Sequence, residues 1–158
     1  LDEALEAARW TGSAPNRQPW RFIVVRHAAL RQELARCGAY AQHLAGAPVV
    51  VALAADTDAG SDTDFDVGRA AQSLMYAAGR RGLGSCPATF FPEQNVHRAG
   101  RLLGVDPPWL VRWAISLGWP AREDPPPGRG VGPSRSAIPT GRLPPATVRR
   151  DVPAPPEA

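Results

Sequence analysis

The sequence predicts one domain of the α/β or α+β class, followed by a proline-rich segment. Stretches with apolar residues at helical spacing alternate with short runs of β-branched and aromatic residues, as in domains that pack helices on a sheet. The chain has 158 residues and is 44% apolar, which is enough for one packed core. Beyond Gly118 the composition changes, because 11 of the 18 prolines lie between Pro120 and Pro156. We therefore divide the chain into residues 1–122 and 123–158.

The first expected elements are a helix, a loop and a strand. Apolar residues at helical spacing between Leu1 and Ala8 predict an amphipathic helix that ends near Trp10. Because the chain starts inside this pattern, we expect its natural N-terminus to lie further upstream. Residues 11–19 concentrate turn formers, and each proline among them disfavours helix at the residue before it. The aromatic and β-branched residues of 20–26 predict a strand.

A second helix and a buried strand come next. Leu30, Leu34 and Cys37 fall on one side of the expected helix, and the uninterrupted apolar run of residues 48–55 predicts a strand that is covered on both faces. This run is the longest apolar stretch of the chain. It is far shorter than the roughly 20 residues that a membrane-spanning helix needs, so we expect no membrane partner.

The acidic segment 56–64 has the composition of a metal-binding loop. It lacks the glycine and the glutamate that an EF-hand loop requires at its sixth and twelfth positions, so a solvated loop that caps the next helix is the better interpretation. The expected helix covers residues 65–81. Its stripe of small and apolar residues permits the close approach of another helix or of a partner subunit.

The last expected elements are a short apolar segment over residues 82–91, broken by Pro87, a helix over 92–103 and a strand over 109–117. A proline-rich stretch lacks the backbone donors for ladders and helices. We therefore expect the remainder to form no regular structure, either as a disordered tail or as an extended arm that lies on another surface.

Composition excludes several kinds of chemistry. All 18 basic residues are arginine, so a lysine Schiff base, a P-loop lysine and a lysine general base are impossible. Cys37 and Cys86 are too few for a disulfide framework, which favours a reducing, cytoplasmic setting. His27, His43 and His97 lack metal-ligand spacing, and no serine-nucleophile motif is present. A net charge of +3 with scattered arginines does not predict nucleic-acid binding.

The segment Ser13–Trp20 is the most informative one. Its polar amides and hydroxyls alternate with prolines that fix the backbone, immediately before an expected strand. A rigid loop of this kind can present donors and acceptors to the edge of a planar heterocycle with little loss of entropy. From these residues alone, an ordinary helix-to-strand turn that satisfies its own backbone remains the alternative.

Four segments carry a resemblance to a known family. Residues 8–22 closely resemble the hallmark loop of the FMN-dependent nitroreductase family, and residues 65–74 resemble its central helix. Residues 82–87 resemble its flavin-facing segment, and residues 117–120 resemble the Gly-Tyr-Pro sequence that closes its last core strand. The motifs occur in the family's order over most of the first 122 residues, which makes the resemblance more specific than any single motif.

The resemblance implies an α+β sandwich, in which helices wrap a central, mainly antiparallel sheet, and an intertwined homodimer with FMN at the subunit interface. It also implies a cytoplasmic oxidoreductase. NAD(P)H would deliver hydride to flavin N5 and leave, and a nitroaromatic, a quinone or a similar small acceptor would then be reduced. The flavin carries this chemistry, so we expect no catalytic side chain, no metal and no nucleic acid.

The resemblance also assigns cofactor-binding residues by position. On one side of the ring, commonly from the neighbouring subunit, these are Gly12, Ser13, Ala14, Asn16 and Gln18. On the other side they are Pro87, Ala88 and Thr89. A backbone N–H near Thr89 would point at flavin N5, where it would tune the atom that accepts hydride.

The chain departs from the family pattern in two places. The family's arginine-rich phosphate motif precedes the helix that begins at Leu1, so only late residues can be assigned to the phosphate. Arg142 matches those late residues better than Arg135 does. Many members have glutamate where Thr89 stands, which bears on acceptor preference.

Two other functions remain open. One is a family member that stores flavin, or a remnant that has lost turnover. The other is a protein that binds nucleic acid or an acidic surface.

Overall fold

The structure is a computed structural model that describes residues 1–120 and 144–148. The chain divides into two units, Leu1–Ala121 and Arg122–Ala158. The elements in chain order are α1 (Asp2–Arg9), β1 (Trp20–Val25), α2 (Ala28–Ala35), α3 (His43–Gly46), β2 (Val49–Asp56), α4 (Thr63–Arg80), β3 (Gly84–Thr89), α5 (Glu93–Leu103), β4 (Trp109–Gly118) and α6 (Pro145–Val148).

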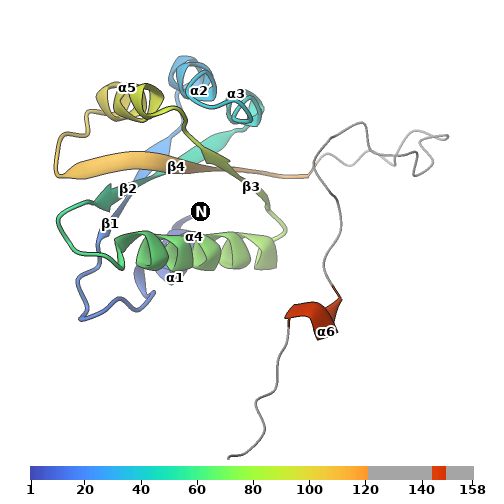
Figure 1. Cartoon of the computed structure of the whole chain (residues 1–158). Coiled ribbons are helices and arrows are strands. Elements are labelled where there is room, and N and C mark those ends of the chain that lie inside the picture. The colour runs from blue at the N-terminus through green and yellow to red at the C-terminus, as the bar shows by residue number, and fades with distance from the viewer. Residues whose placement is uncertain (121–143, 149–158) are drawn as a thin grey trace, which may run out of the picture. The chain divides into compact units, whose positions relative to one another are not determined.

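The first unit contains a four-stranded antiparallel sheet with the order β1-β2-β4-β3 (Figure 1). Every neighbouring pair of strands is antiparallel. The register between β2 and β4 shifts between Leu53 and Ala54, where a bulge lies. The expected α+β sandwich with an antiparallel sheet is therefore confirmed.

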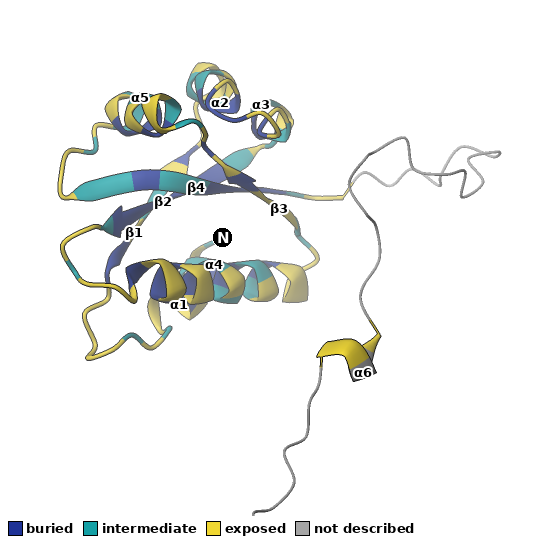
Figure 2. Ribbon diagram, in the orientation of Figure 1, coloured by how far each residue is buried: buried dark blue, intermediate teal, exposed yellow. Residues whose placement is uncertain are grey.

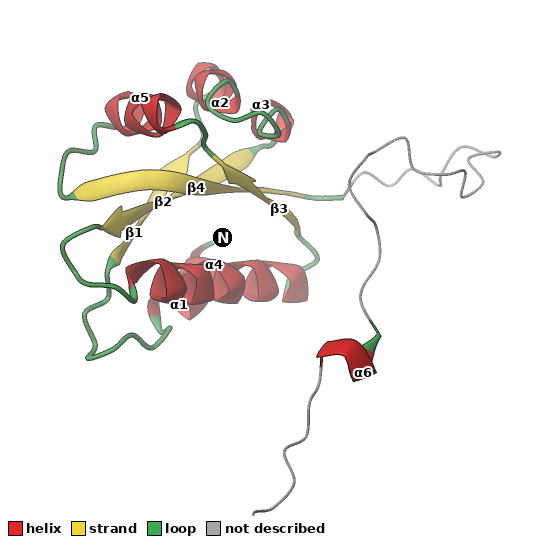
Figure 3. Cartoon of the chain, in the orientation of Figure 1, coloured by secondary structure: helices red, strands yellow, loops and turns green. Residues whose placement is uncertain are grey.

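Helices cover both faces of this sheet. Helices α1 and α4 lie on one face, and α2, α3 and α5 lie on the other (Figure 3). Strand β2 is buried over most of its length (Figure 2), because its side chains alternate between two cores. Val51 and Leu53 pack toward α1 and α4, whereas Val50 and Ala52 pack toward the other helices. This explains why the strand is an unbroken apolar run.

Helix α4 is the long support of the first face. Val67, Ala70, Leu74 and Ala78 recur at three- and four-residue spacing and are all buried against the sheet and α1. The helix begins earlier than its apolar pattern, because the buried Thr63 donates its hydroxyl to the carbonyl of Asp56 at 3.2 Å. Among the described helices, none has the length and apolar character to cross a membrane.

Two sequence-based expectations need correction. Residues 82–91 were expected to be a broken segment, but Gly84–Thr89 forms strand β3. Pro87 is tolerated there because β3 lies at the edge of the described sheet, where a missing N–H breaks no ladder. The expectation that the proline-rich region forms no helix was wrong at α6, where a proline occupies the first helical position. The rest of that region, including Arg135 and Arg142, lies outside the described residues.

Candidate flavin site around helix α4

The loop between α1 and β1 folds on its own hydrogen bonds. The backbone N–H of Gln18 donates to Ser13 Oγ at 2.8 Å, and the N–H of Asn16 donates to the Ser13 carbonyl at 2.5 Å. Asn16 and Gln18 have φ values of 65° and 52°, in the left-handed region. For residues other than glycine, this region costs on the order of 1–3 kcal/mol and occurs often at ligand clamps. The loop is thus a self-satisfied turn that also stores strain.

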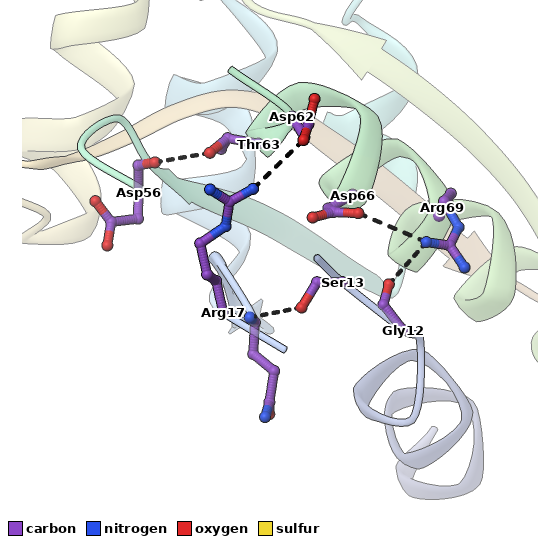
Figure 4. Close-up of polar contacts among 9 residues, drawn as sticks. Gly12, Ser13, Arg17, Asp56, Asp62, Thr63, Asp66 and Arg69 are labelled. Atoms are coloured by element: carbon purple, nitrogen blue, oxygen red, sulfur yellow. Dashed lines mark hydrogen bonds and ion pairs between the residues drawn. The ribbon is translucent and has the colours of Figure 1, made fainter. Parts of the chain in front are cut away.

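Two arginines attach this loop to α4 (Figure 4). Arg69 donates from Nη1 to the Gly12 carbonyl at 2.9 Å and lies 3.6 Å from Asp66 Oδ1. In the other direction, Nη2 of Arg17 in the loop lies 3.6 Å from Oδ2 of Asp62, the residue before α4. These contacts fix the position of the loop relative to the first two turns of the helix.

Asp66 is an unusual part of this attachment. Its side chain is only 2% exposed, and its Oδ2 has no hydrogen-bond partner among the described residues. A buried carboxylate without a compensating cation is costly, so the half-exposed guanidinium of Arg69 is its natural partner. The sequence analysis missed both residues. The signal was available, since an acid three residues before an arginine forms a pair on a helix.

The β3 side of the site opens onto a cavity of about 220 Å³ between the sheet and α4. Pro87 contributes to the wall of this cavity, next to its strand-pairing partner Ile115 of β4. The lining residues are Leu53, Asp64, Val67, Gly68, Ala71, Pro87, Trp113, Ala114 and Ile115. The walls are therefore almost entirely apolar, with one indole and one carboxylate.

The three expected residues of β3 do not face the same way. Ala88 is buried in the core on the opposite face of the sheet, so only its backbone is near the cavity face. Thr89 is exposed and lies two residues after Pro87, on the same face. The N–H of Phe90 donates to the Arg112 carbonyl of β4 at 2.8 Å. By strand alternation, the N–H of Thr89 is directed to the open edge of the described sheet.

Both candidate stretches therefore meet α4, but at different places. The loop reaches it through Arg69, and the cavity uses Gly68 and Ala71. Within the described residues, no hydrogen bond or ion pair joins the loop to β3. The sequence analysis interpreted the small residues of α4 as a packing stripe and did not identify Asp64 or Trp113. Only the packing of α4 on β4 brings those two residues to the same cavity.

Other reactive side chains lie outside this cavity. Burial raises the pKa of the Cys37 thiol, whereas Cys86 is exposed. Among the residues that the structure describes, no three histidine, cysteine, aspartate or glutamate side chains form a possible metal site.

An antiparallel sheet between two helical layers, with a strained amide-bearing loop and an apolar cavity on one long helix, defines an α+β sandwich protein with a candidate ligand site. A profile of the Nitroreductase family matches residues 1–37 and 32–119. The chain belongs to the nitroreductase family.

Individual relatives agree with this assignment. The chain is 30% identical over 129 residues to a candidate NADH dehydrogenase/NAD(P)H nitroreductase of Archaeoglobus fulgidus, over 78% of this chain and 74% of the relative. A similarly named protein of Methanothermobacter thermautotrophicus is 30% identical over 125 residues, over 77% of this chain and 65% of that protein. The solved FMN-dependent nitroreductase of Clostridium difficile R20291 superposes with a TM-score of 0.73 at 26% identity, covering 78% and 76% of the two chains.

Proposed function

We propose that this protein is a cytoplasmic, FMN-dependent oxidoreductase that uses NAD(P)H to reduce nitroaromatics, quinones or similar small acceptors. The observation that carries the proposal is that Pro87 lines an apolar cavity on α4, the helix to which the amide-bearing loop is attached. A relative with the same fold is an FMN-dependent nitroreductase. Two free thiols agree with a reducing compartment.

The described residues fit the ring portion of FMN. The apolar cavity walls and Trp113 suit a planar aromatic system, and the exposed amides of Asn16 and Gln18 suit its polar edge. Bound FMN would supply hydride acceptance and donation at N5. The N–H of Thr89 at the open strand edge is the group that would donate a hydrogen bond to flavin N5. Arg142, which lies outside the described residues, is our candidate for the phosphate.

The size of the cavity supports a homodimer. Ligand pockets usually enclose about 300–1,000 Å³, and 220 Å³ is too small for a ring plus a second substrate. We infer that the loop of a second copy, with Gly12, Ser13, Ala14, Asn16 and Gln18, completes the site. Trp10, directly after α1, and Phe65 and Tyr76 on α4 are about 70% exposed, which is apolar surface that a partner would cover.

The visible spectrum of the purified protein tests the proposal. We expect flavin absorbance that bleaches with NADH or NADPH under anaerobic conditions and returns when a nitroaromatic or a quinone is added. We also expect the mass of a dimer at micromolar concentration. Tight FMN binding with turnover no faster than that of free flavin would instead indicate a storage protein. A chain that does not bind millimolar FMN would indicate a remnant.

A further inference from the structure

Asp64 is the one charged residue among the nine that line the cavity. It lies in the first turn of α4 and is exposed. Its neighbours Asp62 and Asp66 are each 3.6 Å from an arginine. Among the described residues, no cation forms an ion pair with Asp64. Its charge therefore acts on whatever enters the cavity.

Among the described residues, the surroundings of Asp64 do not cancel its negative charge. The N-terminus of α4 offers about half a positive charge, which offsets only part of one carboxylate. Asp56 and Asp58 precede the helix and add further negative charge to the same acidic stretch. The remaining cavity walls are uncharged, so they supply no compensating group.

We propose that Asp64 sets the acceptor specificity of this site by disfavouring anionic aromatic acceptors and favouring neutral or cationic ones. The proposal rests on the proposed function, since it concerns the acceptor that would stack on the ring at the open side of the cavity, where Asp64 is exposed. A carboxylate on the acceptor would meet a like charge beside walls of low dielectric constant, where repulsion is stronger than in water. Repulsion between two negative charges at a partly hydrated site should weaken the binding of an anionic acceptor relative to a neutral one by about 3- to 10-fold. Added salt should reduce the effect.

The test compares 4-nitrobenzoate with its neutral analogue 4-nitrobenzamide. For the wild-type holoprotein, kcat/KM should favour the amide, and Asp64→Asn should reduce this preference about 3- to 10-fold. Asp58→Asn is the matched control, because it removes the same charge from the same stretch at an exposed position outside the cavity. It should leave the preference within about 2-fold of wild type.

Binding of the same two compounds, measured by titration calorimetry, extends the test to a protein without turnover. An unchanged ratio of dissociation constants in Asp64→Asn, or an equal change in Asp58→Asn, would overturn the role of Asp64. Loss of FMN, or absence of turnover with both acceptors, would count against the proposed function. The ratio of dissociation constants still decides the specificity role in that case. Thermal melts of both variants confirm that they are folded.

Discussion

Replacing Gly68 by leucine should make the protein more stable and a poorer flavin binder. Gly68 lies within α4 and lines the cavity, and a Cβ at this position would meet no atom within 4 Å. Leucine is a good helix former, whereas glycine in a helix interior costs about 0.8–1.0 kcal/mol relative to alanine. We therefore expect the free energy of unfolding to rise by about 0.5–1 kcal/mol. For a chain of this size, that raises Tm by roughly 1–4 °C.

The same side chain would occupy the cavity. Its four carbon atoms must share about 220 Å³ with the ring that we place there. Overpacking of a filled site typically costs about 1–3 kcal/mol, which corresponds to a loss of FMN affinity of about 5- to 150-fold. Stability and affinity should thus change in opposite directions, which a partly unfolded variant cannot imitate.

Gly79→Leu provides the matched control. Gly79 lies on the same helix with equally open space around its Cβ position, but it does not line the cavity. Its stability gain should be no larger, because it lies in the last turn, and its FMN affinity should stay within about 2-fold of wild type. Thermal unfolding of the apoprotein, FMN fluorescence titration and light scattering give the three readouts. A folded Gly68→Leu dimer that binds FMN as tightly as wild type would refute the placement of the ring.

Three further outcomes are expected. Arg69→Met removes the hydrogen bond to the Gly12 carbonyl and leaves the Asp66 carboxylate uncompensated. Because Arg69 is half exposed, we expect the free energy of unfolding in urea to fall by about 1–2 kcal/mol and FMN to bind more weakly. Wild-type values for both quantities would contradict the attachment of the loop through Arg69. Hydrogen bonds from Arg9 and Trp10 lower the pKa of Glu6 from 4.5 to about 2, so its stabilisation is complete above pH 4.5 and is lost as the pH falls toward 2. Glu6→Gln should therefore flatten the dependence of Tm on pH in that window, and an unchanged slope would count against these hydrogen bonds. A thiol reagent should modify Cys86 in the native protein and Cys37 only after unfolding, whereas two equally fast thiols would contradict the burial of Cys37.

The sequence predicts the elements whose pattern depends on burial alone. The apolar run of β2 and the helical spacing of α4 are local signals, and each element lies within two residues of its expected bounds. Helix α3, with only four residues, was not expected, because one turn leaves too little periodicity to detect. Strand β3 was interpreted as a broken segment, because the sequence does not reveal that Pro87 lies on an edge.

The candidate site is less predictable because its parts come from separate elements. The amide-bearing loop is recognisable as a contiguous motif. The cavity is not, since Asp64 and Gly68 share one face of α4, but Trp113 joins them only through the packing of α4 on β4. Likewise, Asp66 and Arg69 have the spacing of a helical ion pair, but their role in holding the loop appears only in the contact of Arg69 with Gly12. Tertiary packing thus creates the part of the site that local patterns cannot show.

The alternation of strand β3 explains how one short segment can serve two purposes. Ala88 points into the core behind the sheet and fixes the strand, while Pro87 and Thr89 remain on the face toward α4. Because Pro87 has no N–H and the N–H of Thr89 is directed to the open edge, Thr89 supplies a backbone donor two residues from the apolar wall. A planar ring could place its apolar part on that wall and one polar atom near this donor, whereas a ligand that is polar throughout would leave most of its groups unsatisfied there. We therefore expect this strand to bind the apolar face of a flavin ring better than a wholly polar ligand, independently of the loop that would cover the other side of the ring.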